Sequence, residues 1–155
     1  MVQNQENCHT QSEFNRQEAP ASVSATEDFV VHFRYGLPGF EMLTRFVIRK
    51  IPKYEPLRIL RSEEDSNISM MIADPRLLQL EKPIRIPFAY QQQLHIEQPT
   101  DMQLYVILRY DAKAERLTAN TKAPIVVNTA RRMGLQIILE DPVLRVEQRL
   151  FENHD

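Results

Sequence analysis

From Phe29 onward, apolar and polar side chains alternate with a period of two, which is typical of strands with one buried face. The first such run, residues 29–35, places three aromatic residues and Val31 on one face and His32 and Arg34 on the other. Later runs with this period contain, in chain order, Phe46 and Ile48; Leu57 and Ile59; Ile68, Met70 and Ile72; Leu104, Val106, Leu108 and Tyr110; Ile125 and Val127; Leu135, Ile137 and Leu139; and Leu144 and Val146. The run at 104–110 is also apolar on its reverse face, so we expect a central strand there.

Helices are expected to be few and short. Nine of the ten prolines lie from Pro38 onward, and no stretch of 15 residues has a clean 3.6-residue period. One short helix is predicted at 75–80, with Asp74 as its N-cap, and another at 88–94. The sequence therefore predicts a mainly β single domain, a small antiparallel barrel or sandwich with one or two short helices.

The N-terminal segment differs in composition from the rest of the chain. Residues 1–22 are polar and acidic and contain too few bulky apolar groups to offset their ordering entropy, so we predict a disordered tail. The folded domain is expected at 23–150, followed by a short C-terminal tail at 151–155. Residues 1–28 hold one basic and five acidic residues, so their net charge is -4 and the remainder of this -2 chain carries +2.

Charge and hydropathy exclude several classes of function. A body with a net charge of only +2 does not indicate general nucleic-acid binding. No apolar run approaches the ~18 residues of a membrane span. The first 20 residues have neither the basic start nor the apolar stretch of a signal peptide, so we expect a cytoplasmic protein without membrane attachment.

The glycine-containing loop after the first predicted strand has the composition of a type II turn. In the segment 37–40, Pro38 stands at the second position and Gly39 at the third, where a positive φ is required. Together with Gly36 these residues predict a tight turn at the end of a strand. Neither a GxGxxG pattern nor a Walker loop is present, which argues against a phosphate site.

No catalytic, cofactor or metal site is predicted from the remaining residues. The four histidines lack metal-ligand spacing, Cys8 is the single cysteine, and no serine has the GxSxG context of a hydrolase. The adjacent Arg131 and Arg132 leave one alternative open, a small RNA-binding β-barrel acting directly on mRNA. A solvated surface turn is the simpler interpretation of this pair.

Several phrases taken together resemble one family. They are GLPGFE at 36–41, TANTKAPIVVN at 118–128 and GLQIIL at 134–139, with Leu60-Arg61-Ser62, Ile72-Ala73-Asp74-Pro75 and Val106-Ile107-Leu108 between them. In this order and spacing the chain closely resembles the bacterial flagellar assembly factor family, FliW, over roughly residues 23–150.

This resemblance implies a compact β-barrel-like protein without catalytic activity or cofactor. Family members bind two alternative protein partners, cytoplasmic flagellin and the RNA-binding translational repressor CsrA. Export of flagellin frees the factor to capture CsrA and relieve repression of flagellin translation, at a site away from the RNA-contacting surface of CsrA. The resemblance thus implies a partner switch, a monomer when free, and no direct nucleic-acid contact.

Three departures from the family pattern stand out. The strand expected before the GLPGFE-bearing strand is replaced by the small and polar segment 22–25. The TAN motif is followed by Thr121 where the family usually has leucine. The acidic tail is additional, and it could attract a basic partner.

The candidate partner contacts lie in loops, because loops carry function more often than strands do. They are Phe40, Glu41, Asn120, Asn128 and Arg131. A structural role competes at several of them: Phe40 as a core residue, Asn120 as a turn cap, and Asn128 as a partner for backbone groups at a strand end.

Overall fold

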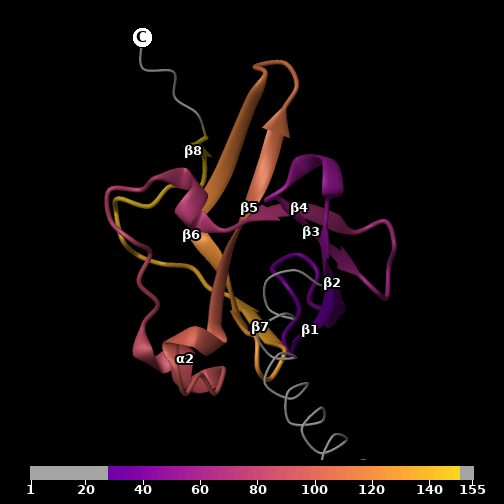
Figure 1. Ribbon diagram of the computed structural model, residues 1–155, viewed down its shortest axis with the longest axis vertical. Helices are drawn as coiled ribbons and strands as arrows, with labels where there is room; N and C mark the ends of the chain where they lie inside the picture. The colour runs from indigo at the N-terminus through magenta and orange to yellow at the C-terminus, as the bar shows by residue number, and fades with distance from the viewer. Residues whose placement is uncertain (1–27, 151–155) are drawn as a thin grey trace, which may run out of the picture.

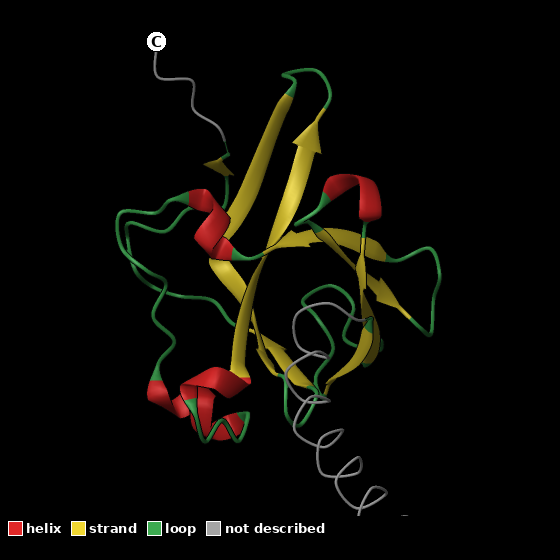
Figure 2. Ribbon diagram, viewed as in Figure 1, coloured by secondary structure: helices red, strands yellow, loops and turns green. Residues whose placement is uncertain are grey.

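The computed structural model describes residues 28–150, in which eight strands form a single sheet (Figure 1). The strands are β1 (Phe29–Phe33), β2 (Arg45–Lys50), β3 (Arg58–Ser62), β4 (Ser69–Ala73), β5 (Met102–Asp111), β6 (Arg116–Asn128), β7 (Met133–Gln136) and β8 (Gln148–Arg149). The α-helix α2 (Phe88–Gln93) and the 3-10 helices η1 (Pro52–Tyr54), η2 (Pro75–Leu78) and η3 (Pro99–Asp101) lie around the outside of the strands (Figure 2).

Seven of these strands close into a barrel. The strand order is β5-β4-β3-β2-β1-β7-β6, and β6 pairs back onto β5. All neighbours are antiparallel except β1 and β7, which run parallel with His32 opposite Met133. β8 adds to the free edge of the upper part of β6, where the β5–β6 hairpin extends beyond the barrel (Figure 1). The prediction of a mainly β barrel is confirmed, with one parallel pair at its closure.

Alternation of side chains along the strands produces cores on both sides of the barrel wall. The interior is filled by Phe29, Val31, Phe33, Leu37, Phe46, Ile48, Leu60, Ile72, Tyr105, Ile125 and Val127. Phe33 and Phe46 meet edge to face with ring centroids 5.5 Å apart. Outside the wall, the segments at 84–96 and 137–144 cover Val126, while Leu78 of η2 and Leu150 pack against Val106, Leu108 and Ala119.

Both predicted helical segments are confirmed. η2 begins after Asp74, whose carboxylate accepts a hydrogen bond from the Arg76 N–H at 2.9 Å, and Pro75 occupies the first position. α2 occupies residues 88–93, close to the predicted 88–94. The predicted tails at 1–22 and 151–155, and the polar segment at 22–25, lie outside the described residues.

Two strand predictions were wrong in detail near the beginning of the chain. β1 ends at Phe33, so Tyr35 does not share the buried face and is 58% exposed. The third strand starts at Arg58, after Leu57, and its interior residue is Leu60 while Ile59 is half-buried on the outer face. The alternating pattern was recognised in both strands, but the end of the first strand and the inward-facing positions of the third were predicted wrongly.

The C-terminal strand predictions were also wrong. β7 ends at Gln136, and Ile137 and Leu139 are buried in irregular chain whose N–H groups donate to carbonyls of Pro124 and Lys122. The expected strand at Leu144 and Val146 is a loop, in which Val146 is 61% exposed. The last strand is instead β8, two residues further on.

Candidate protein-interaction surface

The loop between β1 and β2 contains the predicted type II turn. The Phe40 N–H donates to the Leu37 carbonyl at 2.7 Å, and Gly39 has φ +86°, as the third turn position requires. Gly36 also has positive φ, +65°, and packs so tightly that an added Cβ would lie 2.4 Å from the Phe40 carbonyl oxygen. The two glycines and Pro38 therefore build the turn as predicted.

This turn is anchored in the barrel by Leu37 and presents other apolar side chains outward. Leu37 is 1% exposed and belongs to the interior core, whereas Phe40 is 36% exposed and Met42 88% exposed. The core residue of the turn is thus Leu37, and Phe40 lies at the surface. Tyr35, Phe40 and Met42 together are called the turn surface below. The Arg34 guanidinium lies over the Tyr35 ring, 5.6 Å from its centroid.

Two carboxylates hold the backbone on either side of the turn surface. Glu41 accepts from the Gly39 N–H at 3.0 Å, and the backbone N–H groups of Glu41 and Gly39 lower the pKa of the Glu41 carboxyl. Glu64, from the β3–β4 loop, accepts from the N–H groups of Thr44 and Arg45 at 3.0 and 2.8 Å, which lowers its pKa. These contacts fix the loop in a defined shape.

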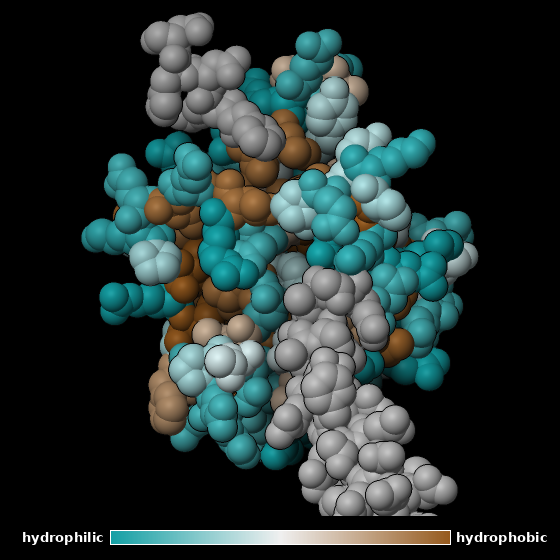
Figure 3. Space-filling model, in the orientation of Figure 1, coloured by the Kyte–Doolittle hydropathy of each residue, from teal (hydrophilic) through white to brown (hydrophobic). Residues whose placement is uncertain are grey.

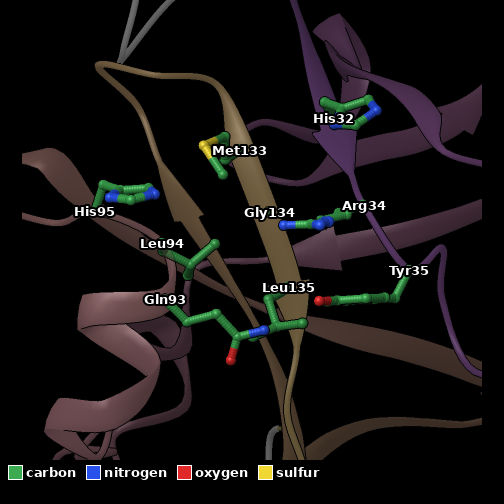
Figure 4. A pocket seen from close by; sticks show the side chains of 9 residues that line it. All are labelled: His32, Arg34, Tyr35, Gln93, Leu94, His95, Met133, Gly134 and Leu135. Atoms are coloured by element: carbon green, nitrogen blue, oxygen red, sulfur yellow. The ribbon is translucent and has the colours of Figure 1, made fainter.

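A small cavity of about 60 Å³ lies beside the turn surface (Figure 4). The parallel pairing of β1 with β7 brings His32, Arg34 and Tyr35 next to residues 133–135, and the end of α2 supplies residues 93–95. Figure 4 shows the Tyr35 ring extending toward Leu135. Within residues 28–150 no group of histidine, cysteine or acidic side chains is arranged to hold a metal ion.

Asn128 and Arg131 lie together at the β6–β7 turn, and they differ in accessibility. Asn128 is 1% exposed; its Nδ2 donates to the carbonyls of Leu94 and His95, and its Oδ1 accepts from the N–H groups of Ala130 and Arg131. The side chain is therefore inside the protein, where it bonds backbone groups at the end of a strand. The Arg131 guanidinium is exposed and lies 3.6 Å from Glu97.

Asn120 is half-buried in the middle of β6, where four residues of β6 stand opposite one residue of β5. Its Oδ1 accepts from the Ala123 N–H at 3.1 Å and so stabilises this bulge, which also accommodates Pro124. The neighbouring Thr121 is completely buried, and its hydroxyl donates to the Arg145 carbonyl and accepts from the Arg145 N–H. Threonine here thus fastens the C-terminal segment to the barrel.

The five candidate contacts do not form one site. Phe40 and Glu41 lie on the β1–β2 loop, Arg131 with buried Asn128 at the β6–β7 turn, and Asn120 within the β6 bulge. Sequence reasoning missed Tyr35 and Met42, which flank the turn and are its most exposed apolar side chains. Tyr35 stands directly before Gly36, where the alternation of the first strand ends. This position was the signal in the sequence that Tyr35 could lie at the surface.

A second group of apolar side chains is visible on the face shown in Figure 3, over the segments that pass outside β6. Three further apolar side chains, Ile138, Val143 and Val146, are 65%, 58% and 61% exposed. They lie in the irregular segment after β7 and are not adjacent in sequence to the turn surface. None of the helices within residues 28–150 has the length and apolar character needed to cross a membrane.

Comparisons with known proteins agree with the fold. A sequence model of the family described as "FliW protein" matches residues 15–150. Among curated relatives, the flagellar assembly factor FliW of Bacillus velezensis is 35% identical over 77% of this chain and 83% of its own length. The protein of the same description from Caldanaerobacter subterraneus subsp. tengcongensis is 31% identical over 84% and 87%, respectively.

A solved structure gives the same result in three dimensions. The crystal structure of the flagellar assembly factor FliW superposes with a TM-score of 0.74 at 31% identity, covering 81% of this chain and 88% of that one. The sequence and structural comparisons agree, and the chain belongs to the FliW family.

Proposed function

We propose that the protein is a cytoplasmic, non-catalytic flagellar assembly factor that acts by binding other proteins. Its partners are a CsrA-type translational repressor and flagellin, bound as alternatives, so that flagellin export frees it to antagonise repression. Membership of the FliW family supports the flagellar role, because the curated relatives are described as flagellar assembly factors. The partner switch rests on the family resemblance.

The observation that carries the protein-binding role is the turn surface. Exposed aromatic and methionine side chains on a rigid loop are enriched at protein interfaces, where they bury large apolar areas at little entropic cost. Tyr35 and Met42 are 58% and 88% exposed, yet the loop between them is fixed by Leu37 in the core. A binding surface that is already ordered loses little conformational entropy when a partner docks.

Direct RNA binding is the competing function, and the basic pair at the β6–β7 turn is poorly placed for it. Arg131 lies near Glu97, and the Arg132 guanidinium lies over the Phe29 ring at 5.9 Å. Both cations therefore already have partners within the protein. A gel shift on flagellin leader RNA separates the two functions, because binding by this protein alone, falling steeply with salt, would favour the RNA-binding alternative.

The proposal is tested by pull-down of the full-length chain with its cognate CsrA-type protein and flagellin. Each partner is expected to be retained separately, and excess flagellin is expected to displace the repressor. Retention of neither partner at micromolar concentration would overturn the proposed function.

Variants at the turn surface connect this test to the structure. Phe40→Ala and Met42→Ser are expected to weaken partner binding about tenfold or more, as interface anchors do. Phe40→Ala should destabilise the fold by less than the ~3 kcal/mol typical of a buried phenylalanine. Tyr54→Ser, at an exposed aromatic residue of η1 outside the turn surface, is the matched control. Equal binding by all three variants would place the interface elsewhere.

A further inference from the structure

One end of the barrel interior is lined by polar side chains. The inward-facing apolar positions of four strands are Leu60, Ile72, Tyr105 and Val127. Two residues away from each of these positions, toward the same end of the barrel, lie Arg58, Asp74, Gln103 and Thr129, respectively. Because side chains two apart in a strand share a face, this end of the interior is a polar layer above the apolar core.

These polar residues surround a cavity of about 260 Å³, called the mouth pocket below. It is completed by Pro56, Arg76, Thr100, Met102 and the phenol of Tyr105. The mouths of β-barrels are frequent ligand sites, and this volume accommodates a group of several heavy atoms.

Most polar groups in the mouth pocket already have partners. The Asp74 carboxylate accepts from Arg76 Nε at 3.0 Å and from Gln103 Nε2 at 2.9 Å. Burial raises the pKa of Asp74, but these hydrogen bonds outweigh burial and the pKa is lowered, so the carboxylate stays charged and paired. Arg58 donates to the carbonyls of Pro56 and Leu57, and the Thr129 hydroxyl donates to the Asp101 carbonyl.

The exception is Tyr105, whose hydroxyl makes no hydrogen bond within the described part of the chain although the residue is only 6% exposed. No fully buried side-chain nitrogen or oxygen in residues 28–150 lacks a partner, so this hydroxyl must be open to the pocket. Burial raises the pKa of Tyr105 to about 12, which keeps the phenol protonated and able to donate. A buried donor aimed into a cavity is a group that a ligand would satisfy.

The hydrogen-bond donors in the pocket select the kind of ligand. The lining contains two guanidinium groups, of which Arg58 lies 3.6 Å from the Glu55 carboxylate and Arg76 is paired with Asp74. Arg76 Nη1 makes no hydrogen bond within the described residues, and the Tyr105 phenol is a second donor without a partner. We propose that the mouth pocket binds a carboxylate, which accepts hydrogen bonds from the Tyr105 hydroxyl and Arg76. The carboxylate belongs either to a small dicarboxylic acid or to an acidic side chain of a bound protein.

This inference is independent of the turn surface and of the identity of the protein partners, since the two sites use different residues. Failure of the carboxylate site would leave the proposed function standing, and the reverse also holds.

The test uses the full-length protein and follows its amide NMR signals during titration with succinate, with neutral succinamide as the matched control ligand. A second titration uses an acetylated, amidated di-glutamate peptide, with the di-glutamine peptide as its control. We expect saturable shifts around Gln103 and Tyr105 with succinate or the acidic peptide and none with the neutral compounds. If only succinate causes saturable shifts, the ligand is a free small acid. If only the acidic peptide causes them, the ligand is a carboxylate of a bound protein.

Tyr105→Phe removes only the hydroxyl and is expected to weaken carboxylate binding about tenfold, the effect of losing one hydrogen bond to a charged group. Tyr110→Phe, at an exposed tyrosine of the same strand, should bind like the unmodified protein. Absence of saturable shifts with both carboxylates at millimolar concentration overturns the proposal. So does equal carboxylate affinity of a folded Tyr105→Phe protein. Should that variant not fold, the titration of the unmodified protein decides alone.

Discussion

Gly36 and Gly39 both adopt positive φ, but their surroundings differ. A Cβ on Gly36 would lie within 2.7 Å of backbone atoms of Phe40 and Glu41, whereas a Cβ on Gly39 would have nothing within 4 Å. The first position therefore requires glycine for space and conformation, and the second for conformation alone.

Alanine at the two positions should separate these requirements. Gly39→Ala is expected to lower the free energy of unfolding by about 1–2 kcal/mol, the cost of a left-handed conformation. Gly36→Ala should lower it by more, because backbone atoms must also move apart. Urea denaturation measures both values, and a smaller effect at Gly36 than at Gly39 would contradict the turn geometry.

Asn128 illustrates how far sequence reasoning reaches at the level of one residue. The sequence offered two interpretations of it, a candidate partner contact or a side chain that bonds backbone groups at a strand end. Whether its amide served a partner or the chain itself depended on Leu94 and His95, more than 30 residues away, which no local pattern connects to it.

Replacement of Asn128 by alanine is expected to destabilise the fold by about 2–4 kcal/mol, because buried backbone groups lose their partners. Arg131→Ala, three residues further on and exposed, should change stability by less than about 0.5 kcal/mol. Thermal unfolding of both variants checks this contrast. If the Asn128→Ala protein were as stable as the Arg131→Ala protein, the structural role of Asn128 would be contradicted.

At the scale of the element, strand order and phase were less predictable than the existence of strands. Ile137 and Leu139 keep the alternating burial of a strand, but they pack on the outside of the barrel against the β6 bulge, where no regular ladder forms. Val146 follows Pro142 and a turn closed by the Leu144 N–H and the Asp141 carbonyl, so its segment stays irregular. An alternation with a period of two indicates which side chains are buried. Whether the segment forms a strand also depends on the residues, far along the chain, that its backbone must pair with.

The Glu64 carboxylate of the β3–β4 loop helps to hold the start of β2, and this contact depends on pH. Backbone N–H groups of Thr44 and Arg45 lower the pKa of Glu64 from its ordinary value of 4.5, so the charged form stabilises the fold. This contribution is complete above pH 4.5 and is lost as the pH falls through the lowered pKa of the folded state. The stability difference between the unmodified protein and Glu64→Gln should therefore shrink as the solution is acidified through this range. A difference that is constant between pH 7 and strongly acidic conditions would contradict the role of the charge.

At the scale of the whole molecule, the three cores share the barrel wall, so they should unfold together. Ile72→Ala in the interior and Leu139→Ala on the outside are each expected to cost about 2–5 kcal/mol. Both should shift one common transition, seen equally by circular dichroism and tyrosine fluorescence. Separate transitions in the Leu139→Ala protein would show that the outer cluster is an independent unit.

The pairing of β1 with β7 has a consequence for how the protein is made. β1 is among the first segments of the barrel to leave the ribosome, yet one of its two edges can be covered only after Met133 and Gly134 have been synthesised, some hundred residues later. Until then the nascent barrel keeps an open strand edge, the kind of surface on which chains associate wrongly. Completion of the fold is therefore tied to completion of synthesis, and products that stop before β7 are expected to be substrates for chaperones and proteases.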